Sequence, residues 1–177
     1  MISVKRVYLS GGMEYADDEG RDWRQSLQAW IETEFGWTVF NPNRESDLFF
    51  TTRYPSIDVR ALKAVDVMQY KRIVEQLVEI DCREIAQRSD IVICYWDESA
   101  IRGAGTKGEI TVAKHFGKPV YMVTASPLQE IPGWVLACTT RIFTSFDHLK
   151  TFLSGPDHLS HEKRGRRPAR GDIQQKD

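Results

Sequence analysis

The stretch Ile91-Val92-Ile93-Cys94-Tyr95-Trp96 is an unbroken run of apolar residues, and a second run of this kind spans residues 120–123. Continuous hydrophobicity over such a length is typical of a parallel strand that is covered on both faces. Shorter strand-like runs at residues 7–10, 38–40 and 141–144 bring the expected number of strands to about five. The pattern therefore predicts a parallel sheet buried between helices.

Apolar residues at helical spacing separate the expected strands. Helices are predicted from Asp22 to a stop at Gly36, in two segments over 57–88, from about Thr106 to Phe116, and over 146–153. Strands that alternate with helices indicate right-handed βαβ units and an α/β fold. Residues 43–56 are interpreted as an aromatic-rich loop. In such folds ligands bind beyond the carboxyl ends of the strands, where glycines 11–12 and the glycine-rich stretch 103–108 fall.

Composition limits the classes of partner. The chain has 177 residues, and we assign residues 1–155 to one α/β domain and residues 156–177 to a polar, basic tail that we expect to be disordered. The net charge of −1 gives no general attraction for nucleic acid, and no apolar run approaches a membrane span. Three cysteines without CxxC spacing favour free thiols. We expect a cytoplasmic protein with no membrane or nucleic-acid partner.

The segment Gly103-Ala104-Gly105-Thr106-Lys107-Gly108-Glu109 follows a predicted strand and opens a predicted helix. Thr106 and Glu109 satisfy the S/T-x-x-E capping box, so a helix cap is one interpretation. The other is a carboxylate nucleophile, because the helix dipole favours an ionised Glu109 and the glycines allow close approach of a substrate. Spacing alone does not separate the two.

Asp81 falls inside the apolar stripe of its own predicted helix, between Val74, Leu77 and Ile85. Burial of an ionised carboxylate without partners costs several kcal/mol, so this position requires an explanation. A buried salt bridge or a loop cap is one explanation. A carboxylate directed into a cleft, as an acid, a base or a ligand of sugar hydroxyls, is the other.

Tyr8 is placed at the end of the first strand, where it either packs in the core or orients a carboxylate through its hydroxyl. Asp97 and Ser99 follow the third strand, where a binding loop would begin. The glycine stretch matches GxGxxG only formally, because the next strand is not followed closely by an acidic residue. The chain has no P-loop ending, no GxSxG elbow and no His/Cys metal spacing.

Three ordered segments, "VYLSGGM" at 7–13, "EIDCREIAQRSDIVI" at 79–93 and "GTKGEITVAKHFGKPVYMV" at 105–123, resemble the nucleoside 2-deoxyribosyltransferase-like family. The resemblance covers about two-thirds of the chain. It implies a flavodoxin-like fold and cleavage of the N-glycosidic bond of a nucleoside or its 5′-monophosphate, by base exchange or hydrolysis, without a metal or redox cofactor.

The resemblance also implies roles for individual residues. Glu109 maps to the nucleophile, Asp81 to an acid/base or substrate-orienting group, and Tyr8 to the tyrosine that positions the nucleophile. Substrate contacts are expected from residues of the glycine loops and of the third strand's end: Ser10, Gly11, Gly12, Met13, Asp97, Ser99, Gly105 and Thr106. The resemblance implies a homo-oligomer as well, since sites in this family often use a neighbouring subunit.

Two departures from the family pattern bear on the substrate. Gly103 replaces a polar residue that often lies six positions before the glutamate. The only asparagines are Asn41 and Asn43, so the asparagine that transferases of the family supply from a neighbour's C-terminal region is missing. The stretch "GAGTKGE" is also similar to the cytokinin-activating (LOG-type) phosphoribohydrolases, which cut the same kind of bond. The remaining alternatives are a non-catalytic nucleotide-binding module and an interaction protein that uses the basic tail.

Overall fold

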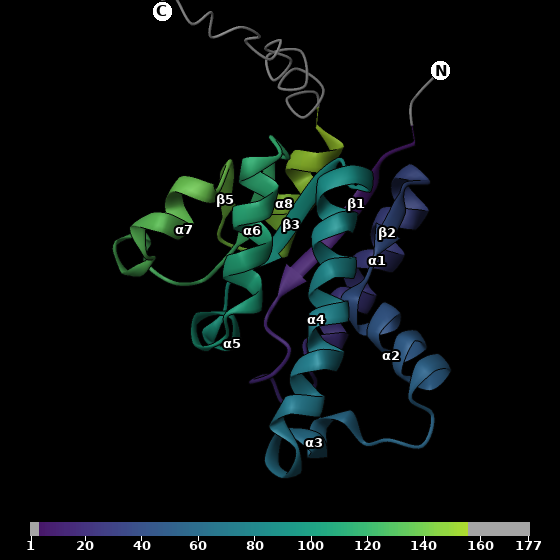
Figure 1. Cartoon of the computed structure of the whole chain (residues 1–177). Helices are drawn as coiled ribbons and strands as arrows, with labels where there is room; N and C mark the ends of the chain where they lie inside the picture. Colours follow the sequence, from purple (N-terminus) through teal and green to yellow (C-terminus); the bar gives the residue numbers. More distant parts are fainter. Residues whose placement is uncertain (1–3, 156–177) are drawn as a thin grey trace, which may run out of the picture.

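Five parallel strands form one sheet in the order β2-β1-β3-β4-β5, and helices pack on both of its faces (Figure 1). The computed structural model describes residues 4–155. The strands are β1 (Arg6–Gly11), β2 (Thr38–Phe40), β3 (Ile91–Tyr95), β4 (Val120–Val123) and β5 (Arg141–Phe143). The α/β, flavodoxin-like sheet that was predicted is confirmed. The predicted tail lies outside the described residues.

One or more helices follow each strand. They are α1 (Arg21–Phe35), α2 (Pro42–Arg53), α3 (Val59–Val65), α4 (Val67–Arg83), α5 (Glu98–Arg102), α6 (Gly105–His115), α7 (Gly133–Cys138) and α8 (Phe146–Ser154), with a π-helical turn η1 (Glu84–Arg88) and a 3₁₀ turn η2 (Leu128–Glu130). Within residues 4–155, no helix is long and apolar enough to cross a membrane.

Side chains of β1 alternate between two cores, as the pleat requires. Val7 and Leu9 pack in a cluster with residues of α1 and α8. Tyr8 lies in the opposite cluster, together with Ile85 of η1 and Ile110 of α6. Ser10 is two residues beyond Tyr8 and therefore points to the same face. The face that α4 and α6 cover thus receives both hydroxyl-bearing side chains of this strand.

Residues 43–56 were predicted to form a loop, but most of them belong to helix α2. The Asn41 side chain accepts a hydrogen bond from the backbone N–H of Asn43, and Pro42 occupies the first turn, so Asn-Pro begins a helix here. Phe49 is buried in a third cluster with Val59 and Ile73. The aromatic residues therefore anchor α2 to α3 and α4.

Candidate active site

Glu109 is the residue at which the two hydroxyl groups of β1 meet. The Tyr8 hydroxyl donates to Glu109 Oε1 over 3.0 Å, and the Ser10 hydroxyl donates to Oε2. On α6, Thr106, Ile110 and Ala113 form the buried stripe, and Glu109 lies beside Ile110 at its edge. The Glu109 side chain is only half-buried. Both carboxylate oxygens are therefore held in place while the residue stays partly accessible.

The capping-box interpretation of Glu109 is wrong. Helix α6 begins at Gly105, its N-cap is Ala104, and that cap makes no side-chain hydrogen bond. Thr106 is already the second residue of the helix and is buried. Glu109 therefore directs its carboxylate across to β1 instead of back to the start of its own helix. The structure brings Glu109, Tyr8 and Ser10 together from segments about one hundred residues apart.

Asp81 lies on the last turn of α4 and is half-buried. Burial and the charge of Glu109 raise the pKa of Asp81 to about 8, against smaller opposing effects of the Tyr8 hydroxyl and Arg24. Among residues 4–155 Asp81 forms no ion pair, so the predicted alternative of a buried salt bridge is not found. Its helix stripe also differs from the prediction, since Val74 and Leu77 are only half-buried and Ile73 is the buried residue of α4.

Burial also raises the pKa of Glu109, although the hydroxyl of Ser10, the charge of Arg24 and the hydroxyl of Tyr8 oppose this rise. The negative charge of Glu109 disfavours ionisation of Asp81. Glu109 accepts two hydroxyl donors, whereas Tyr8 has a single hydrogen and gives it to Glu109. The arrangement therefore favours an ionised Glu109 and a protonated Asp81.

Tyr8 combines the two roles that the sequence offered as alternatives. It is fully buried and stacks on Phe40 at 5.2 Å between ring centroids, and its hydroxyl still reaches Glu109. Burial and the charges of Glu109 and Asp81 raise the pKa of Tyr8 well above its usual value. Tyr8 was predicted at the end of the first strand, but it is the third residue of β1. The phenol is therefore a fixed neutral donor.

The remaining predicted contacts occupy the rim of this cluster. Gly12 is buried against α5, where an added Cβ would lie 1.9 Å from Ser99 Oγ. A binding loop was predicted to begin at residues 97–99, but these residues open helix α5. Asp97 is the N-cap of this helix, and its carboxylate accepts hydrogen bonds from the backbone N–H of Ala100 at 2.9 Å and from the Ser99 hydroxyl at 2.7 Å. Gly11 is buried, Met13 is half-buried and Gly105 is exposed. Their contacts with a substrate stay predictions.

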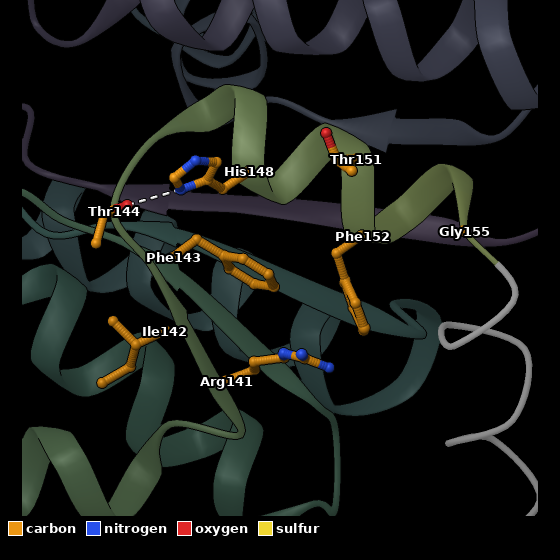
Figure 2. Close-up of a pocket in the computed structure, with 8 residues that line it drawn as sticks. All are labelled: Arg141, Ile142, Phe143, Thr144, His148, Thr151, Phe152 and Gly155. Atoms are coloured by element: carbon orange, nitrogen blue, oxygen red, sulfur yellow. Dashed lines mark hydrogen bonds between the residues drawn. The ribbon is translucent and has the colours of Figure 1, made fainter.

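A cavity of about 310 Å³ lies between α2 and α4 and reaches Asp81. Its walls combine apolar residues of both helices with polar residues of α2: Leu48, Phe49, Leu77 and Ile80, and Glu45, Ser46, Thr52 and Arg53. A larger cavity of about 530 Å³ lies beside β5 and α8, where Arg141, Phe143 and Phe152 line it (Figure 2). That second cavity contains none of the predicted site residues.

Arg24 was not predicted as part of the site. It lies on the inward stripe of α1 with Leu27 and Ile31, and its side chain is fully buried. The periodicity that singles out Asp81 applies equally to Arg24, so the signal was present in the sequence. In the described part of the chain, no group of three or more His, Cys, Asp or Glu residues is placed to hold a metal ion.

Comparison with known proteins identifies no family for this chain. No family model matches it, and no curated protein matches it. Among solved structures, the CMP N-glycosidase BcmB of Clostridium botulinum is similar, with 17% sequence identity and a TM-score of 0.49. The match covers 84% of this chain and 97% of that chain. A likeness at this level does not establish a shared activity.

Proposed function

We propose that this protein cleaves the N-glycosidic bond of a (deoxy)nucleoside or a nucleoside 5′-monophosphate, with Glu109 as the nucleophile. The observation that carries the proposal is the pairing of a held, half-buried Glu109 carboxylate with a second carboxyl group, Asp81, whose pKa is raised to about 8. Two carboxyl groups in different protonation states are what a retaining displacement at an anomeric carbon requires.

In the first step, an oxygen of Glu109 attacks C1′ of the sugar, and the bond between C1′ and the base nitrogen breaks. The electron pair goes to the base, and the proton of Asp81 neutralises the departing nitrogen. In the second step, water or another base attacks C1′ and releases Glu109. The proton of that nucleophile returns to Asp81, so the enzyme regains its starting state.

The cavity between α2 and α4 suits the base. Its apolar residues Leu48, Phe49, Leu77 and Ile80 offer a surface for a planar heterocycle, and a ligand seated there touches Asp81. The sugar and any 5′-phosphate would extend toward the first turn of α6. Space around Gly105 is open, and Ala104 provides no side-chain cap for the first backbone N–H groups.

The test is a trapped sugar. The full chain is incubated with a panel of nucleosides and 5′-monophosphates, free base is followed by chromatography, and intact mass is measured for a glycosyl adduct. We expect base release and an adduct with the parent and with Glu34→Gln, which changes an exposed glutamate on α1. We expect neither with Glu109→Gln. Thermal stabilisation by a nucleotide that persists in Glu109→Gln, with no turnover by the parent, would instead indicate a binding module.

We also propose that the chain forms a homo-oligomer. Support comes from exposed apolar side chains on α2 and around α3 and α4: Leu48, Val65, Val67, Met68, Val78 and Ile80. Light scattering after size exclusion tests this proposal, because Val78→Lys and Met68→Lys should then lower the measured mass. A parent that is monomeric at micromolar concentration would contradict it.

A further inference from the structure

Arg24 carries a charge into the interior of the protein. The side chain is fully buried, and its guanidinium donates to the backbone oxygens of Leu9 at 3.3 Å, Gly11 at 2.7 Å, Glu19 at 3.0 Å and Gly20 at 3.2 Å, and to Asn43 Oδ1 at 3.3 Å. All these acceptors are neutral. Within residues 4–155 no carboxylate pairs with Arg24.

A buried cation of this kind is expensive, because desolvation costs several kcal/mol that neutral acceptors only partly offset. Burial accordingly lowers the pKa of Arg24, and the charge of Glu109 is the largest influence in the opposite direction, followed by Tyr8 and Asp97. The carboxylate of the candidate site is thus the main negative charge that the buried cation faces. The reverse also holds, since the charge of Arg24 opposes the rise in the pKa of Glu109.

The hydrogen bonds of Arg24 also have a definite geometry. Two of its acceptors, the carbonyl oxygens of Leu9 and Gly11, lie on either side of Ser10. Ser10 in turn donates to Glu109 Oε2. Glu19 and Gly20, at the end of the loop that follows β1, are held by the same guanidinium. Arg24 therefore connects the carboxyl end of β1 to the start of α1 through hydrogen bonds. Ser10 lies between the two residues of β1 that Arg24 contacts.

We propose that Arg24 is a positioning residue of this site. Its guanidinium fixes the Leu9–Ser10–Gly11 backbone so that Ser10 reaches Glu109, and its buried positive charge keeps Glu109 ionised without contact with substrate. The inference deepens the proposed function and rests on it for its catalytic meaning. The effect of Arg24 on the pKa of Glu109 is measurable without any substrate.

Other titratable groups interact electrostatically with Glu109 or with Asp81. They are Tyr8 from β1, Asp81 and Cys82 from α4, Glu84 from η1 through its effect on Asp81, and Cys94 from β3. Burial raises the pKa of the Cys94 thiol, which therefore stays neutral. Asp81 is the carboxyl group whose pKa the charge of Glu109 raises. Its signal is assigned separately by Asp81→Asn.

The experiment follows the carboxyl carbon of Glu109 by ¹³C NMR in the full chain, with the signal assigned from its loss in Glu109→Gln. Arg24→Met removes the charge and keeps the length of the side chain, and Arg24→Lys keeps the charge but loses the planar fork. The control is Arg6→Met, which breaks the ion pair of Arg6 with buried Glu84. It therefore costs stability on β1, the strand that also carries Ser10.

We expect the titration midpoint of Glu109 to rise by about one pH unit in Arg24→Met and to stay within about half a unit of the parent in Arg24→Lys and Arg6→Met. A folded Arg24→Met with an unchanged midpoint would overturn the inference and leave Arg24 a purely structural residue. If Arg24→Met does not fold, Arg24→Lys decides, since a midpoint raised by a full unit there would also overturn it. Absence of turnover by the parent would refute the proposed function without changing these midpoints.

Discussion

The Tyr8 hydroxyl lies 3.0 Å from Glu109 Oε1, although the two residues are 101 positions apart in the chain. The contact exists because α6 packs over β1, an interior strand that pairs with β2 and β3. A fully buried tyrosine inside such a strand has no freedom to move away. The phenol is therefore a permanent donor to the carboxylate, present before any ligand binds.

Tyr8→Phe removes this donor and keeps the stacked ring. Because the Tyr8 hydroxyl opposes the rise in the pKa of Glu109, we expect that pKa to rise further in the variant. With the proposed function, kcat/KM at neutral pH should fall about 10- to 100-fold, mainly through kcat. Steady-state kinetics with a substrate found in the panel measures both constants.

The matched control for Tyr8→Phe is Tyr95→Phe. Tyr95 packs in the cluster on the opposite face of the sheet, against Trp23 and Phe146. Loss of its hydroxyl should leave kcat within about twofold of the parent. An equal loss of activity in both variants would mean that the effect comes from general destabilisation and not from the contact with Glu109.

The pH dependence of activity should have a basic limb set by Asp81. The pKa of Asp81 is raised to about 8, and its proton is needed for the departing base, so kcat/KM should fall as the pH rises through about 8. The acidic limb belongs to Glu109, whose pKa lies above the usual value for a glutamate. Rate profiles between pH 4 and 10 measure both limbs. In Asp81→Asn the basic limb should disappear and the remaining rate should be low.

Stability should also depend on pH through Asp81. In the unfolded chain this aspartate ionises near its ordinary pKa of 3.8, whereas in the folded protein it holds its proton to about pH 8. Folding therefore binds a proton between these values, and the free energy of unfolding should decrease as the pH rises through this window. Asp81→Asn removes the effect. Urea unfolding should find the variant more stable than the parent by about 1–3 kcal/mol at pH 8 and by little at pH 4.

The opposite pH trend in this comparison would contradict the assignment of the proton to Asp81. The exposed Asp90 is not a suitable control, since its carboxylate accepts from the backbone of Arg6. Asp17→Asn is suitable, because Asp17 is exposed in the loop before α1. We expect no difference in pH dependence between Asp17→Asn and the parent.

Local sequence patterns predicted the strands of the sheet well, because each strand coincides with a run of apolar residues in the sequence. The continuous runs at Ile91–Trp96 and Val120–Val123 became β3 and β4, almost residue for residue. Helix α2 was missed because its aromatic residues face α3 and α4 and not the sheet. Its Asn-Pro start also resembles the end of a strand as much as the beginning of a helix.

The candidate site was predictable only in part, for a physical reason. The position of Asp81 on an apolar stripe marks it as unusual, and the same test, applied to α1, would have found Arg24. The partner of Glu109 was beyond local reasoning. The spacing of Thr106 and Glu109 fits a capping box, and only the packing of α6 over β1 decides that the carboxylate bonds Tyr8 and Ser10.

Gly12 and Gly108 provide a paired prediction on the glycine loops. An added Cβ at Gly12 would lie 1.9 Å from Ser99 Oγ and 2.6 Å from the backbone nitrogen of Ala100, so the β1–α1 loop or α5 would have to shift. We expect Gly12→Ala to lower the free energy of unfolding by about 1–3 kcal/mol. At Gly108, inside α6, nothing lies within 4 Å, so Gly108→Ala should raise it by up to about 1 kcal/mol through the better helix propensity of alanine. Chemical denaturation of both variants measures the two effects, and a Gly12→Ala protein as stable as the parent would show that α5 does not pack against this loop as described.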